Sequence, residues 1–89
     1  MLCIFRKKKF EKDIELASRR GKDLNKIKTV LAYLVEQSPL HKHYKDHCLK
    51  GEYSDCRECH IELDWLLIYS IDNHGDLILI RTGSHSDLF

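Results

Sequence analysis

The chain has 89 residues, 43% of them hydrophobic, with one proline and four glycines, which excludes a disordered protein and predicts a single domain over residues 1–89. Its net charge of +1 hides an asymmetry, because residues 1–50 hold 13 Lys/Arg against 6 Asp/Glu (+7), whereas residues 51–89 hold 2 against 8 (−6). A basic half of this kind favours nucleic acid or an acidic partner, with a pair of solvated basic helices as the alternative.

Residues 2–5 (Leu-Cys-Ile-Phe) are predicted to form a short strand. The basic run Arg6–Lys9 follows this apolar start, which is the reverse of a secretory signal. No apolar run is long enough to span a bilayer. We therefore expect a cytoplasmic protein without a membrane partner, in which the four cysteines are thiols.

Two basic helices are predicted next. Between Lys7 and Arg20, an apolar stripe recurs at spacings of four and three: Phe10, Ile14 and Ala17. Gly21 is expected to end this helix. Asp23 can cap a second one, whose apolar face comprises Leu24, Ile27, Leu31 and Leu34. Ser38-Pro39 is expected to end it, because the residue before proline avoids the helical conformation.

Strands are predicted in the second half, over Cys56–Ile61, Trp65–Ile71 and Leu77–Thr82. The middle run is apolar on both faces, which indicates a central strand. Asp72-Asn73-His74-Gly75 forms the turn between the last two strands. The prediction is an α+β domain in the order β-α-α-β-β-β, with an antiparallel sheet packed against the N-terminal helical hairpin.

The run Cys56-Arg57-Glu58-Cys59-His60 has the C-x-x-C-H spacing of covalent haem attachment. A zinc site formed with Cys48 is the related hypothesis. Both are disfavoured, because residues three apart on a strand point to opposite faces and cannot grip one ligand. The sequence also lacks the export signal and the suitable axial methionine that a haem protein of this kind needs. We predict free thiols and no metal or other cofactor.

Histidines, an aspartate and an arginine gather near the predicted strand ends. His60 lies four residues before Asp64, and Arg81 four before His85. Adjacent antiparallel strands can bring these positions together. Histidine moves protons near neutral pH, and arginine stabilises phosphate charge, so the set suits cleavage of a phosphodiester.

Two aromatic residues can contact bases. Phe89, the last residue, has little expected packing role and can stack on RNA. Trp65 follows Asp64 directly, but a tryptophan at the start of an apolar strand is a core residue more often than not.

The ordered motifs of the second half resemble the YafQ-type toxins of the RelE/ParE superfamily. They are Tyr44-Lys45-Asp46-His47, Leu49-Lys50-Gly51, Arg57-Glu58-Cys59-His60, Asp64-Trp65-Leu66-Leu67-Ile68-Tyr69 and Arg81-Thr82-Gly83-Ser84-His85-Ser86-Asp87-Leu88-Phe89. The length and the β-α-α start also agree, so the resemblance covers essentially the whole chain. It departs from the family at Cys48, often a proline, and at Cys56, commonly an aromatic residue.

The resemblance implies a RelE-like fold and a metal-independent endoribonuclease that cuts mRNA in the ribosomal A site. In that family the 2′-hydroxyl attacks the adjacent phosphate. The implied catalytic residues are His47, His60, Asp64, Arg81 and His85. The implied RNA-binding residues are Lys45, Trp65 and Phe89.

The implied partners are a cognate antitoxin, the ribosome with its mRNA, and operator DNA through the antitoxin complex. The basic helices would contact ribosomal RNA phosphates. The alternative function is a non-enzymatic, ParE-like inhibitor of DNA gyrase. Such a binder has no need for three histidines and an aspartate together, so their joint presence favours the nuclease.

Overall fold

A strand and two amphipathic helices begin the fold in the computed structural model, which describes residues 2–89. They are β1 (Cys3–Arg6), α1 (Lys8–Arg19) and α2 (Leu24–Val35). Met1, the only methionine and hence the only candidate methionine ligand for haem, lies outside the described residues.

The predicted end of α1 and the predicted cap of α2 are confirmed. Phe10 and Ala17 are buried on one side of α1. Gly21 adopts a φ of +80°, the left-handed conformation that ends a helix. Asp23 caps α2, where its carboxylate accepts a hydrogen bond of 3.0 Å from the Asn25 backbone N–H.

α2 ends at Val35, earlier than the predicted end at Ser38-Pro39. Gln37 takes a left-handed φ of 57°, and the Ser38 N–H donates to the Tyr33 carbonyl at 2.9 Å. This pair of features is a Schellman-type end formed without glycine, so it leaves no strong signal in the sequence. No helix among residues 2–89 has the length and apolarity needed to cross a membrane.

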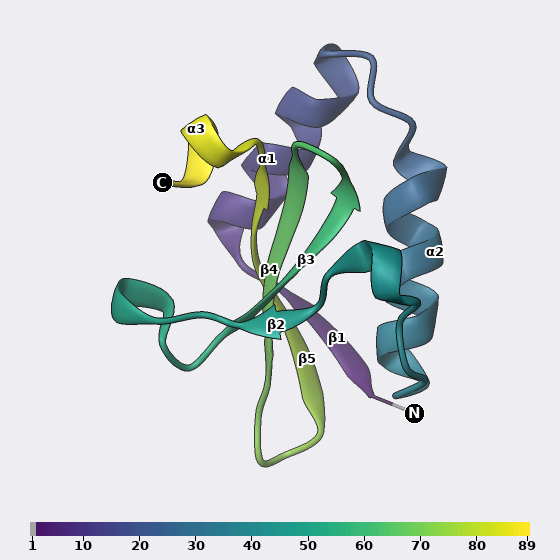
Figure 1. Cartoon of the computed structure of the whole chain (residues 1–89), viewed down its shortest axis with the longest axis vertical. Coiled ribbons are helices and arrows are strands. Elements are labelled where there is room, and N and C mark those ends of the chain that lie inside the picture. Colours follow the sequence, from purple (N-terminus) through teal and green to yellow (C-terminus); the bar gives the residue numbers. More distant parts are fainter. Residues whose placement is uncertain (1) are drawn as a thin grey trace.

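The second half forms the sheet with β1 (Figure 1). Its strands are β2 (His47–Cys48), β3 (Arg57–Glu62), β4 (Trp65–Ile71) and β5 (Asp76–Gly83), in the spatial order β1-β5-β4-β3-β2. β4 is central, as predicted, and β2 to β5 are antiparallel. β1 instead pairs with β5 in parallel, so the predicted antiparallel sheet is mixed at this edge.

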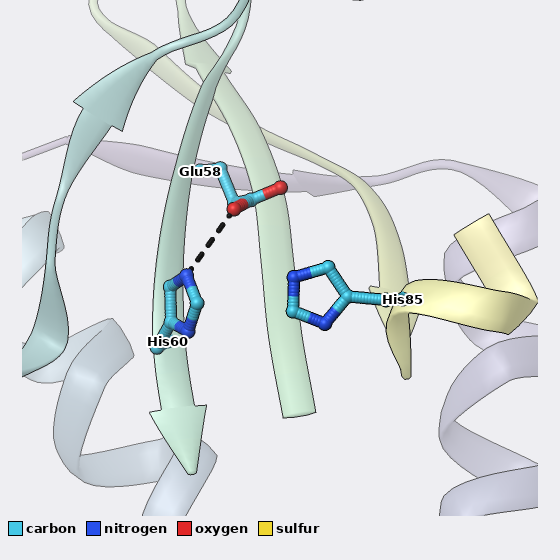
Figure 2. Close-up of side chains that lie close together, drawn as sticks. All are labelled: Glu58, His60 and His85. Atoms are coloured by element: carbon cyan, nitrogen blue, oxygen red, sulfur yellow. Dashed lines mark ion pairs between the residues drawn. The ribbon is translucent and has the colours of Figure 1, made fainter. Parts of the chain in front are cut away.

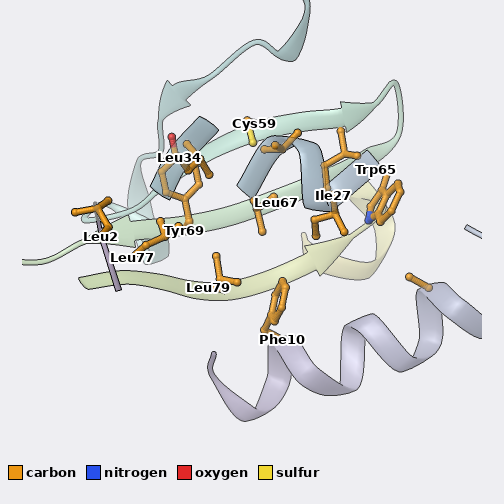
Figure 3. Close-up of a cluster of buried hydrophobic side chains, with 13 residues drawn as sticks. Leu2, Phe10, Ile27, Leu34, Cys59, Trp65, Leu67, Tyr69, Leu77 and Leu79 are labelled. Carbon is orange, nitrogen blue, oxygen red and sulfur yellow. The ribbon is translucent and has the colours of Figure 1, made fainter. Parts of the chain in front are cut away.

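Each face of the sheet has its own apolar cluster. Leu67, Tyr69 and Leu79 pack with α1 and α2 in the main core (Figure 3). Leu66 and Ile68 point to the opposite face and pack against Leu88 of the short helix α3 (His85–Leu88). This alternation explains why β4 is apolar throughout. The second face carries the candidate site.

The cysteines of the C-x-x-C-H run lie in different clusters, as the strand argument predicted. Cys59 is fully buried in the main core, and Cys56 packs in the cluster of the second face. Burial raises the pKa of the Cys59 thiol to about 12. These two thiols are therefore not placed to grip one ligand.

Candidate active site

One row of paired residues crosses the second face of the sheet. His47 on β2 pairs with Glu58 on β3, Glu58 with Ile68 on β4, and Ile68 with Arg81 on β5. Directly paired residues project on the same side of a sheet. Strand spacing places Glu58 and Arg81 about 10 Å apart along this row. Polar side chains, Glu58 and Arg81, therefore lie on either side of the apolar residue Ile68.

Glu58 is a buried carboxylate between two histidines. Its side chain is on the site face and the residue is only 4% exposed. Its Oε1 atom lies 3.4 Å from His60 Nε2 and 3.6 Å from His47 Nε2. A buried carboxylate is costly unless it is paired, and these two imidazoles are the partners that the structure gives it.

The segment before β2 holds His47 in one orientation. The His47 Nδ1 atom lies 2.6 Å from the Lys45 carbonyl oxygen, which can only accept a hydrogen bond. The Nε2 atom then faces Glu58. Asp46 anchors the segment to the sheet by accepting hydrogen bonds from Tyr69 Oη at 2.7 Å and Arg57 Nε at 3.2 Å.

Asp64 and His85 form a pair at the rim. The Asp64 Oδ1 atom accepts the His85 backbone N–H at 3.0 Å and lies 2.7 Å from His85 Nδ1. The backbone bond, followed by the side-chain bond, lowers the pKa of Asp64, so the carboxylate stays ionised. The pair leaves the His85 Nε2 atom available for a substrate.

α3 is built onto the end of β5 by local contacts. Ser84 and Asp87 form a reciprocal capping box at its start. Arg20, which follows the last residue of α1, reaches Asp87 at 2.7 Å and lowers the pKa of this carboxylate. Gly83 approaches this box so closely that an added Cβ would lie 3.0 Å from Asp87. These contacts place His85 beside the sheet.

Arg81 is held in place by Asp13 of α1. Its Nε and Nη2 atoms donate to the Asp13 carboxylate at 2.7 and 3.1 Å. The same carboxylate accepts the Thr82 N–H at 3.1 Å. A bidentate pair orients the planar guanidinium and leaves Nη1 for another acceptor, such as a phosphate oxygen.

Glu58, His60 and His85 also form a possible metal-binding set, since one donor atom from each lies within 4.8 Å of the others. Figure 2 shows the two β3 side chains with the His85 ring directed toward them from α3. Two imidazoles and a carboxylate suit copper or zinc.

Comparison with known proteins decides the family. A family model described as "Bacterial toxin of type II toxin-antitoxin system, YafQ" matches residues 2–89. The chain belongs to the YafQ family. It is 42% identical over 81 residues to the mRNA interferase toxin YafQ of Escherichia coli K12, covering 90% of this chain and 87% of that protein.

Solved structures of YafQ-like toxins agree with the fold. A copper-bound toxin variant from Helicobacter pylori has 40% identity and a TM-score of 0.95, with full coverage of both chains. YafQ in the E. coli DinJ–YafQ complex has 39% identity and a TM-score of 0.91, covering 100% of this chain and 99% of that one. The predicted RelE-like fold and YafQ-type resemblance are confirmed.

Most of the residues singled out from the YafQ resemblance lie together. The second face and its rim bring together His47, His60, Asp64, Arg81 and His85. Lys45 is exposed beside His47. Phe89 is 64% exposed, with its ring edge-on to Tyr53 at a centroid distance of 6.1 Å.

Trp65 requires a correction. It is 1% exposed in the main core, where its Nε1 donates to Thr82 Oγ1 at 2.9 Å. Trp65 is the first residue of a central strand and its ring faces the helices, so it lies on the opposite side from Leu66 and the candidate site. We therefore assign Trp65 to the core and not to RNA contact.

Sequence reasoning missed three contributors to the site. Glu58 was named only within the C-x-x-C-H run and the Arg57-Glu58-Cys59-His60 motif and was given no role, although its two-residue spacing from His60 predicts a shared strand face. Asp13 and Tyr53 come from α1 and from the loop before β3, and both interact with Arg81, raising its pKa. No local pattern connects residues so distant in sequence.

Proposed function

We propose that this YafQ-family toxin, an mRNA interferase, cuts mRNA in the ribosomal A site through attack of a ribose 2′-oxygen on the adjacent phosphate. The products are a 2′,3′-cyclic phosphate and a 5′-hydroxyl. The observation that carries the proposal is the arrangement of His47, His60 and His85 around one face of the sheet, with an arginine on the same row. Because ribosomes and mRNA are in the cytoplasm, we propose that the toxin acts in the bacterial cytoplasm.

Proton transfer requires a base for the 2′-hydroxyl and an acid for the departing 5′-oxygen. His85, oriented by Asp64, presents Nε2 for one transfer. His60 and His47, beside the Glu58 carboxylate, are suited to the other. Arg81 stabilises the charge that develops on the phosphate oxygens. Phe89 and Lys45 then contact the neighbouring base and phosphate.

The assay is cleavage of ribosome-bound mRNA, read by primer extension, together with growth after expression. Asp64→Asn and His85→Gln should each lower cleavage about 100-fold or more, since each removes part of a proton-transfer group. His74→Gln, in the exposed β4–β5 turn, is the matched control and should cut normally. Full cleavage by both site variants would refute the assignment.

We further propose that cleavage needs no metal, and that copper or zinc on Glu58, His60 and His85 inhibits it. The copper-bound H. pylori relative supports metal affinity at such a toxin. Bound metal would occupy the imidazole lone pairs that must exchange protons. Toxin that is treated with EDTA and then dialysed free of it should still cut ribosome-bound mRNA, and cleavage should fall as Cu²⁺ is added, with Glu58→Gln weakening the inhibition. Loss of activity in the EDTA-treated toxin, restored by adding zinc or copper to it, would contradict this proposal.

A cognate antitoxin would neutralise the toxin, as the DinJ–YafQ complex supports for a relative. Co-expression of the neighbouring reading frame should restore growth, and the complex would bring the pair to operator DNA. The gyrase alternative has no support from a relative named as an mRNA interferase. Inhibition of gyrase supercoiling by the purified protein, without mRNA cleavage, would reinstate it.

A further inference from the structure

Two adjoining hollows lead away from His60 along the surface. The first has a volume of about 210 Å³ and is lined by His43, Lys45, His60 and Leu63, among others. The second, of about 290 Å³, lies between α2 and the turn η1 (Lys42–Tyr44). Both hollows include His43 and Ile61, so they form one track that begins at the proposed catalytic histidine.

Rings packed at tilted angles lie along this track, and His43 and Tyr44 are among its lining residues. The His43 ring lies 4.5 Å from His41 and 4.1 Å from Tyr44 between centroids. His41 and His43 are exposed, whereas Tyr44 is half-buried and packs against the main core, so it supports the His43 ring from below the surface. Leu63 adds an apolar surface at the β3–β4 turn and is 85% exposed, the largest exposure among the large hydrophobic residues that the structure describes.

Cations stand at both ends of the track. Lys45 is exposed near His60 and forms no ion pair within the described part of the chain. Lys26 lies at the far end, half exposed and 2.6 Å from Glu62. Thr29 Oγ1 donates to the Asn25 carbonyl, which leaves its lone pairs free to accept.

Exposed rings flanked by lysines are the features with which proteins hold single-stranded nucleic acid. The rings stack on bases, and the cations follow the phosphates. We propose that this track binds the mRNA nucleotides on one side of the scissile bond, with a base stacked on His43 and against Leu63. The inference rests on the proposed function, because it extends the same substrate beyond the cut.

The direct test uses 2′-O-methyl oligoribonucleotides, in which the attacking hydroxyl is blocked, lengthened stepwise on the 5′ or the 3′ side. Adding nucleotides on one side should raise affinity for the wild-type protein about fivefold or more per stacked base. His43→Ala should remove this gain, and His43→Phe should keep it because the ring remains. His74→Ala is the control with an exposed histidine remote from the track.

Ribosome-bound mRNA provides the second measurement. His43→Ala should raise the concentration needed for half-maximal cleavage and alter which codons are cut, while the single-turnover rate at saturation stays normal. Equal oligonucleotide binding and equal cleavage patterns for wild type and His43→Ala would overturn the track. So would a loss of antitoxin affinity alone, which would assign His43 to the antitoxin. Failure of the wild-type protein to cut any mRNA would instead overturn the proposed function.

Discussion

Replacing Trp65 by Phe tests whether this ring belongs to the core or to the RNA site. The indole N–H donates to Thr82 Oγ1 at 2.9 Å, and that hydroxyl donates to the Leu66 carbonyl at 2.6 Å. Phenylalanine keeps a ring but lacks the donor. The lost buried hydrogen bond costs about 1 kcal/mol. The volume left unfilled costs roughly 1 to 2 kcal/mol more.

The sum of about 2 to 3 kcal/mol corresponds to a fall in Tm of roughly 10 to 20 °C for a domain of this size. Thermal unfolding followed by circular dichroism measures it. Thr82→Ser is the matched control, because it keeps the hydroxyl. At 25 °C the folded Trp65→Phe protein should cleave mRNA with an unchanged KM. An unchanged Tm with a raised KM would refute the core assignment and restore RNA contact.

Three further substitutions or treatments probe the site and its support. Glu58→Gln should lower kcat about tenfold or more while Tm holds or rises, since a buried charge is removed; single-turnover kinetics and thermal melts distinguish this from misfolding. Gly83→Ala should displace α3, because its Cβ would lie 3.0 Å from Asp87. This substitution should reduce cleavage with little change in circular dichroism, whereas the control Ser86→Ala should change neither cleavage nor circular dichroism. Exposed Cys48 should react with thiol reagents at pH 8 and Cys59 should not, as mass spectrometry of the folded protein will report. Burial raises the pKa of Cys59 from 9.0 to about 12, so its contribution to stability is fully present below pH 9 and is lost as the pH rises toward 12.

The helices were predictable because their signals are local. The apolar stripe of α1 and the Asp23 cap of α2 both depend on residues within a few positions of each other. The same holds for the β4–β5 turn, where Asp72 accepts the His74 and Asp76 N–H groups at 2.9 Å. Period and capping therefore located these elements without knowledge of the fold.

Long-range pairing was not predictable in the same way. The parallel contact of β1 with β5 joins residues more than 70 positions apart, and β2 has only two residues. Glu58 shows the effect on the site. Its partner His60 is nearby in sequence, but the approach of His47 depends on the register between β2 and β3. The register between two strands depends on the whole sheet, so it cannot be predicted from the sequence of one strand.

The charge asymmetry acquires a structural meaning from these contacts. Acidic groups of the second half pair with cations of the first: Asp87 with Arg20, and Glu62 with both Lys22 and Lys26. The +7 of residues 1–50 is therefore not entirely free for a polyanion. These ion pairs connect the C-terminal end of α1 and the N-terminal end of α2 to the edge of the sheet. Some of the opposite charges therefore help to position the candidate site. Within residues 2–89, the cations near the start of α1 (Arg6, Lys7, Lys8 and Lys9) form no ion pair, which makes them the stronger candidates for contact with ribosomal RNA.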